Sequence, residues 1–159
     1  MLMNSVLLDM SAEERVELAK DYFKQGYNCC QSVVLAFEDL CGCDRETLLK
    51  LTVGLGGGVG RMREVCGCVS GMAILSGIIA PQGPTPHEQK AYAYDLTQKM
   101  AAKFKDQTGS IICREMLKQV KIDNNPVPES RTPEYYRKRP CVSLVELAVR
   151  TVSELLTGE

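Results

Sequence analysis

Cysteine is the residue type with which this chain could do chemistry. The 159 residues include eight cysteines, one histidine and no tryptophan. Two of the thiols stand in Cys66-Gly67-Cys68, directly after a glycine-rich run at 54–60 and the arginines Arg61 and Arg63. Thiolate is the reactive and metal-binding form of cysteine, and neighbouring guanidinium groups favour its formation. We therefore expect Cys66 to be a reactive thiol.

The glycine-rich run could also hold an anionic ligand. A glycine-rich loop that leads into a helix presents backbone N–H groups to a phosphate or a similar group. The residues that would contact such a ligand or cofactor are Gly58, Gly60, Arg61 and Arg63. The run lacks the lysine and the hydroxyl residue that complete a Walker-type loop. Phosphate binding is therefore the less favoured interpretation.

The segment that follows, 65–80, is apolar along nearly its whole length. As a helix it would be apolar on every side, which is typical of a helix in the middle of a bundle. It falls short of the roughly 20 residues that a membrane-spanning helix needs. Gly71 and Gly77 each cost about 1 kcal/mol relative to alanine in a helix interior. We expect these two glycines to lie at close contacts with neighbouring helices.

Capping signals and helical spacing define the other elements. They predict helices at about 12–25, 28–41, 44–53, 86–107, 110–120 and 141–156, and no convincing strand. The predicted fold is therefore all-α, a compact single-domain bundle of about seven helices around the central glycine-containing helix. Residues 1–10 would form an N-terminal extension. Residues 121–140 contain four prolines and would form an irregular loop, which Tyr135 and Tyr136 fold back onto the bundle.

Four of the cysteines fall at predicted helix starts: Cys29 at N1, Cys66 near the start of the central helix, Cys113 at N3 after an N-cap at Ser110, and Cys141 in the first turn of the last helix. The unpaired N–H groups and the helix dipole favour a thiolate there. We expect the four sulfur atoms to meet in one pocket.

The remaining thiols have less favourable predicted positions. Cys41 and Cys43 lie at a helix C-terminus and are expected to be inert or peripheral. Cys30 and Cys68 adjoin the key positions but should point about 100° away on a helix.

Four sequence blocks resemble those of a known family, and together they extend from about 12 to 156. The blocks are Asn28-Cys29-Cys30-Gln31, Cys66-Gly67-Cys68-Val69-Ser70-Gly71, Ser110-Ile111-Ile112-Cys113-Arg114-Glu115 and Arg139-Pro140-Cys141. They resemble the C_GCAxxG_C_C family, small bacterial and archaeal proteins described as redox-active. The family's characteristic cysteines would correspond to Cys29, Cys66, Cys113 and Cys141. The chain departs from the family pattern at Cys30 and Cys68, where alanine is usual.

Three functions follow from this pattern. The first is a thiol–disulfide redox protein in which Cys66 attacks, Cys29, Cys113 or Cys141 resolves, and the partner is an unidentified redox protein or small thiol. The second is an all-thiolate site for zinc or an iron–sulfur cluster, with the same four cysteines as ligands. The third is a non-catalytic helical interaction protein whose thiols are core residues.

The net charge and the composition limit the classes of binding partner that we expect. A formal net charge of −1 gives no basic footprint for nucleic acid. The N-terminal residues do not resemble a secretory signal, and no stretch is long enough to span a membrane. We therefore expect a cytoplasmic protein without membrane insertion, and the oligomeric state stays open. In such a compartment cysteines favour catalytic, redox or metal-binding roles over a disulfide framework.

Overall fold

The computed structural model describes residues 9–158, so most of the predicted N-terminal extension, residues 1–8, lies outside the described residues. Within 9–158 the fold is all-α, as predicted, and no strand is present. The α-helices are Ala12–Lys24 (α1), Cys29–Leu35 (α2), Glu38–Cys41 (α3), Arg45–Thr52 (α4), Gly67–Ile79 (α5), Pro86–Thr108 (α6), Cys113–Met116 (α7), Pro133–Lys138 (α8) and Cys141–Thr157 (α9), with a 3-10 turn at Val53–Leu55 (η2).

Local capping accounts for several helix starts. The Ser11 side chain accepts a hydrogen bond from the Glu14 N–H at 3.2 Å, and the Glu14 carboxylate accepts one from the Ser11 N–H at 2.7 Å. Asn28 and Gln31 make the same reciprocal pair at the start of α2. These are the capping boxes that the sequence predicts.

The predicted helix over 28–41 is divided into α2 and α3. Buried Arg15 of α1 donates a hydrogen bond to the carbonyl of Ala36 at 2.7 Å and pairs with Asp39 at the same distance. Phe37, which is fully buried, stands between the two helices with a non-helical φ of −124°. The break places the Asp39 carboxylate against the Arg15 guanidinium, which lies more than 20 residues earlier in the chain. The local spacing of residues does not encode such a contact.

The predicted helix over 110–120 is reduced to α7. Residues 111–113 pair instead with 64–66: the Cys66 N–H donates to the Ile111 carbonyl at 2.8 Å, and the Cys113 N–H donates to the Glu64 carbonyl at 2.7 Å. This pairing keeps the chain extended before Cys113. Ile112 rather than Ser110 is therefore the N-cap, and Cys113 is the first helical residue instead of N3.

The proline-rich segment 121–140 is irregular except for α8. Thr132 caps this short helix by accepting a hydrogen bond from the Tyr135 N–H at 3.2 Å, with a proline at the first helical position. Tyr136 meets the Phe23 ring edge to face and donates a hydrogen bond to the Lys24 carbonyl at 3.2 Å. The predicted folding of this segment onto the bundle is therefore confirmed for Tyr136.

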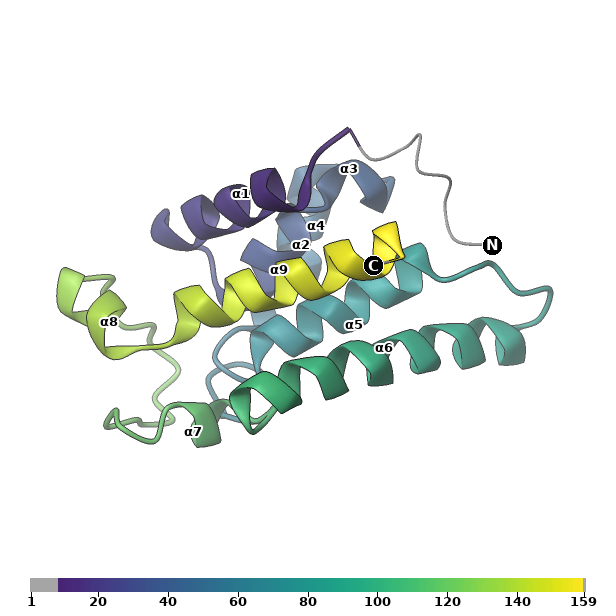
Figure 1. The fold of residues 1–159 in the computed structure, drawn as a ribbon. Coiled ribbons are helices and arrows are strands. Elements are labelled where there is room, and N and C mark those ends of the chain that lie inside the picture. Colours follow the sequence, from purple (N-terminus) through teal and green to yellow (C-terminus); the bar gives the residue numbers. More distant parts are fainter. Residues whose placement is uncertain (1–8, 159) are drawn as a thin grey trace.

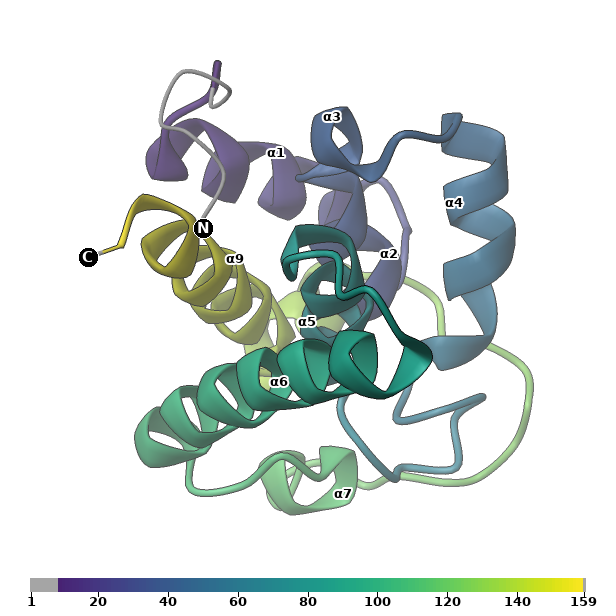
Figure 2. The same cartoon turned by 90° about the vertical axis from the view of Figure 1, so that its right-hand side faces the viewer.

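Helix α5 lies in the middle of the bundle, next to α2, α6 and α9, and α1 covers α2 and α9 (Figures 1 and 2). A Cβ atom on Gly71 would lie 3.1 Å from the Val33 side chain, so this glycine does allow a close helix contact. Gly77 is exposed and a Cβ there would meet no atom within 4 Å, so the predicted tight packing at Gly77 is wrong.

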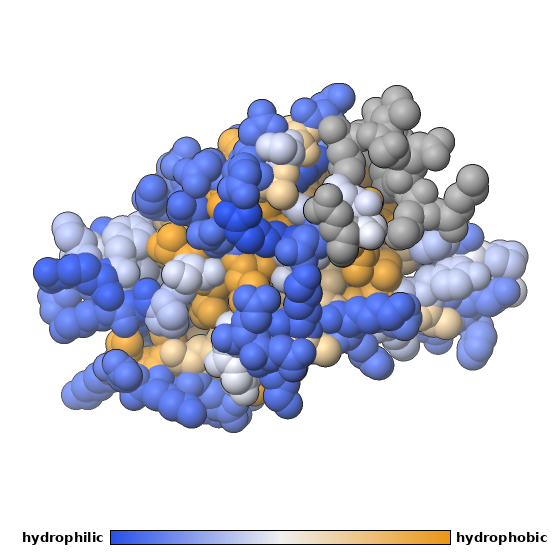
Figure 3. Space-filling view, viewed as in Figure 1, coloured by the Kyte–Doolittle hydropathy of each residue, from blue (hydrophilic) through white to orange (hydrophobic). Residues whose placement is uncertain are grey.

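The first residues of α2, α5, α7 and α9 gather at one end of the bundle, the left-hand end in Figure 1, beside α8 and the loop before α5. Seen from the same direction, hydrophilic residues cover most of the surface and hydrophobic residues show between the helices (Figure 3). None of the described helices has both the length and the apolar character needed to cross a bilayer.

Candidate functional site: a four-cysteine cavity

Four cysteines from four separate helix starts line one cavity of about 60 Å³. We call it the cysteine cavity. Cys29, Cys113 and Cys141 are the first residues of α2, α7 and α9, and Cys66 is the N-cap of α5. The remaining walls are formed by Asn28, Gly57, Gly58, Arg63, Gly67, Met116, Leu117, Arg131, Tyr135, Arg139 and Leu144. The structure thus brings together the four cysteines that the sequence pattern singled out.

The glycine-rich loop closes one side of the cavity in an unusual backbone conformation. Residues 57–61 and Arg63 all have φ between 56° and 69°, the left-handed region. For a non-glycine residue this conformation costs roughly 1–2 kcal/mol of conformational free energy. The loop is held by hydrogen bonds from Gly60 N–H to the Gly54 carbonyl at 2.8 Å and from Glu64 N–H to the Gly58 carbonyl at 2.9 Å.

Two glycines allow the loop and the helices to approach the thiols. A Cβ atom on Gly58 would lie 2.7 Å from the Cβ of Cys113 and from the Glu64 nitrogen. One on Gly67 would lie 3.1 Å from the Cβ of Cys29. The absence of a side chain at these positions therefore determines how closely Cys113 and Cys29 approach the loop and α5.

Cys29 has the most strongly favoured thiolate. The thiols of Cys141 and Cys68 donate hydrogen bonds to its sulfur, and together with the positive charge of Arg131 they hold the pKa of Cys29 well below its usual value, against the effect of burial. The same hydrogen bonds, with burial, raise the pKa of Cys141 and of Cys68 well above the usual value. One thiolate with two thiol donors is therefore the favoured state.

Burial is the main influence on the pKa of two other thiols. It raises the pKa of Cys113, although the neighbouring Arg63 guanidinium acts in the opposite direction. It raises the pKa of Cys30 to about 12. Both groups are therefore protonated at neutral pH.

Cys68 is a site residue that the sequence reasoning missed. The sequence predicts that it points away from Cys66, yet its fully buried thiol lies beside the Cys29 and Cys66 sulfur atoms. Its two-residue spacing from Cys66 at a helix start was the available signal, because an N-cap residue lies off the regular helical spacing. Cys41 and Cys43 do not line the cavity, and Cys43 is exposed.

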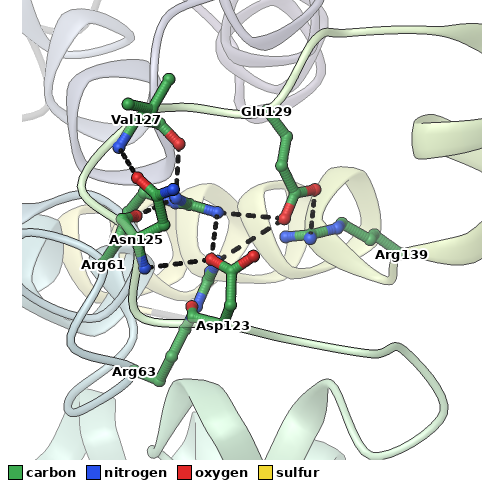
Figure 4. Close-up of polar contacts among 7 residues, drawn as sticks. All are labelled: Arg61, Arg63, Asp123, Asn125, Val127, Glu129 and Arg139. Atoms are coloured by element: carbon green, nitrogen blue, oxygen red, sulfur yellow. Dashed lines mark hydrogen bonds and ion pairs between the residues drawn. The ribbon is translucent and has the colours of Figure 1, made fainter.

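The predicted ligand-contacting residues of the loop separate into two groups. Gly58 and Arg63 line the cysteine cavity, whereas Gly60 and Arg61 do not. Arg61 instead points to residues 121–132, which we call the strap. Its guanidinium donates hydrogen bonds to the carbonyls of Asn125 and Val127 and pairs with Glu129 at 3.1 Å (Figure 4).

Glu129 of the strap is shared by three arginines. It pairs with Arg61, with the buried Arg139, and at 3.8 Å with Arg63 (Figure 4). Arg139 also lies over the Tyr135 ring, with its guanidinium carbon 4.6 Å from the ring centroid. The strap is thereby attached to the same arginine-rich side of the cavity that carries Arg63.

No disulfide joins any of the eight cysteines in the structure, and all eight lie in the described part of the chain. Among residues 9–158, no three cysteine, histidine, aspartate or glutamate side chains are arranged to hold a metal ion. The four cysteines of the cavity are neighbours, and thiols that approach one another in this way are the groups between which a disulfide can form.

A family model described as "Putative redox-active protein (C_GCAxxG_C_C)" matches residues 27–155. A search of curated proteins and a search of solved structures each found no match to the chain. The matched range includes the four cysteines of the cavity, the glycine-rich loop and the strap.

Proposed function

The chain belongs to the C_GCAxxG_C_C family, and from that premise we propose that it carries out thiol–disulfide exchange. Cys29 is the attacking thiolate and Cys141 the thiol that resolves the mixed disulfide. The observation that carries the proposal is the position of Cys29 and Cys141 in the wall of one cavity, where the Cys141 thiol helps to hold the pKa of Cys29 below its usual value. This arrangement supports a thiolate and a second thiol as reaction partners in a cavity that two further cysteines line.

Exposure and charge favour Cys29 over Cys66, to which the sequence analysis assigned the attack. Cys66 is only 4% exposed, whereas Cys29 is half-buried. Thiolate, not thiol, is the nucleophile in exchange, and Cys29 is the thiol whose pKa is held well below the usual value. Cys29 therefore combines the greater exposure of the two residues with the reactive charge state.

The exchange proceeds in two substitutions. The Cys29 thiolate attacks one sulfur of a substrate disulfide, which forms a mixed disulfide and releases the first substrate sulfur as a thiolate that takes up a proton. The Cys141 thiol then loses its proton and attacks the Cys29 sulfur, which releases the second substrate thiol. The substrate gains two electrons, and the protein is oxidised to a Cys29–Cys141 disulfide.

Single-turnover exchange with an uncharged probe, bis(2-hydroxyethyl) disulfide, tests this assignment. Reduced protein should release two equivalents of 2-mercaptoethanol, and peptide mapping by mass spectrometry should find Cys29 joined to Cys141. Cys29→Ser should abolish the reaction. Cys141→Ser should stop at a mixed disulfide on Cys29, while Cys43→Ser, an exposed thiol outside the cavity, should behave as wild type.

A reaction that survives Cys29→Ser would overturn the proposal. A disulfide between Cys29 and Cys68 would support Cys29 as the nucleophile but would show that Cys68, and not Cys141, is the resolving thiol. Metal analysis and a visible spectrum of protein purified without oxygen complete the test, because stoichiometric zinc or the absorption of an iron–sulfur cluster would favour the alternative of metal binding.

The physiological disulfide would belong to a partner protein or to a small thiol compound. We place this activity in the cytoplasm, where cysteines are kept reduced and a dithiol can act as electron donor.

A further inference from the structure

Arg63 carries a buried charge that the described residues leave incompletely paired. It is 3% exposed and lines the cysteine cavity, and its Nη2 atom has no hydrogen-bond partner. The nearest carboxylate, that of Glu129, lies 3.8 Å from Nη2, and the Nε atom makes only a long contact of 3.4 Å with the Asp123 carbonyl. A buried guanidinium with an unsatisfied N–H group is costly, so a position of this kind favours an anionic ligand.

The surrounding charges do not supply the missing anion. Arg131, which also lines the cavity, donates its hydrogen bonds to two neutral groups, the carbonyls of Phe23 and Tyr27. Arg139 shares the Glu129 carboxylate with Arg61 and Arg63, and Arg61 also pairs with Asp123 at 3.5 Å, so these four arginines have two carboxylates between them. The positive charges at the cavity thus outnumber the carboxylates paired with them, even when the Cys29 thiolate offsets Arg131.

The Cys113 thiol does not supply the missing charge either. It lies beside the Arg63 guanidinium, but burial raises its pKa, so it is neutral at pH 7. Arg63 therefore faces an uncharged sulfur.

The volume of the cavity limits what can bind. About 60 Å³ is several times the 10–15 Å³ that one water needs on a comparable measure. It is far below the roughly 300–1,000 Å³ typical of pockets for drug-sized ligands. The space suits an ion of four or five heavy atoms.

We propose that the cysteine cavity binds a small inorganic oxyanion, a central atom with three or four oxygens, anchored by Nη2 of Arg63 beside Cys113. The inference specifies a ligand class for the thiol site and rests on the proposed exchange function for its chemical purpose. The binding itself is measurable without any redox reaction.

Two alkylating reagents that differ in charge test the anion site in the unmodified protein. Iodoacetate is an anion and iodoacetamide is neutral, and both modify thiolates. The ratio of the iodoacetate rate to the iodoacetamide rate, resolved by mass spectrometry, should be at least threefold higher at Cys29 than at exposed Cys43. Sulfate or nitrate should slow iodoacetate at Cys29 and leave Cys43 unchanged. Equal ratios at the two cysteines, or no effect of the oxyanions, would overturn the proposal.

Calorimetric titration of the reduced protein with nitrate or sulfate alone then tests the anchor. Arg63→Met should weaken binding at least tenfold, since it removes a charge-assisted hydrogen bond. Arg63→Lys should retain part of the affinity, and Arg137→Met, which removes an exposed charge outside the cavity, should change it less than twofold. Undiminished binding by a folded Arg63→Met variant, or no binding by wild type, contradicts the assignment.

The outcomes separate this inference from the proposed function. Exchange with the uncharged disulfide but no anion effect would refute the oxyanion site alone. Anion binding with no exchange would refute the exchange function alone.

Discussion

At the scale of single residues, the reactivity of the site depends on which sulfur carries a negative charge. The Cys141 and Cys68 thiols, from two other helices, donate to Cys29 and are the largest influences that lower its pKa. The position of Cys29 at a helix start also favours a thiolate. Hydrogen bonds to the charged form are the stronger influence here, because they act at contact distance inside a low-dielectric cavity.

The first prediction concerns the pH dependence of alkylation at Cys29. In wild type the iodoacetamide rate at Cys29 should stay near its plateau well below the pH at which a free cysteine thiol loses reactivity. Cys141→Ala removes a donor to the thiolate, so the pKa of Cys29 should rise and the profile should shift to higher pH. Cys141→Ser retains a hydroxyl donor and should shift it less. Coinciding profiles for wild type and Cys141→Ala would show that this hydrogen bond does not control the charge of Cys29.

At the scale of elements, the loop between η2 and α5 positions the cavity wall without regular structure. Its run of left-handed residues places backbone directly against Cys113, and its end pairs with residues 111–113. Strain of this kind persists only where surrounding contacts determine it. The loop and α7 therefore form one unit, although they are some 50 residues apart in the chain.

The second prediction compares alanine at two left-handed glycines. Gly58 has φ of 69° and no room for a Cβ, whereas Gly42 has φ of 67° and no atom within 4 Å of one. Gly42→Ala should lower the unfolding free energy by roughly 1 kcal/mol, because alanine is disfavoured in the left-handed backbone conformation but meets no steric clash there. Gly58→Ala should cost about 2 kcal/mol or more and increase the alkylation rate of Cys113, because the loop must move away. Urea unfolding and mapped alkylation measure both effects, and equal costs for the two variants would contradict a steric role for Gly58.

At the scale of the whole molecule, the strap connects two distant parts of the chain and contributes Arg131 to the cavity wall. Arg61 of the loop holds it through the Asn125 and Val127 carbonyls and through Glu129. Arg131 joins its end to the carbonyls of Phe23 in α1 and of Tyr27 between α1 and α2. These contacts join segments more than 60 residues apart. Access to the thiols should therefore depend on the attachment of the strap.

The third prediction tests this attachment. Arg61→Met should increase cleavage within 121–132 in limited proteolysis with thermolysin and raise the alkylation rate of Cys113. The helical content by circular dichroism should stay the same, because Arg61 lies outside the helices. Arg137→Met, at an exposed position on α8, is the matched control and should alter neither rate. An unchanged cleavage pattern in Arg61→Met would show that the strap is held by other contacts.

The sequence alone determined where most helices begin and which cysteines stand at those starts. Such information is local, because a capping side chain and its partner lie three residues apart, as for Asn28 and Gln31. Tertiary structure decided the break at Phe37, the shortening of α7 and the contact between Cys68 and Cys29. It also decided that Arg63 enters the cavity while Arg61 turns to the strap. Each of these depends on groups far apart in the chain, so no local pattern of residue types could specify them.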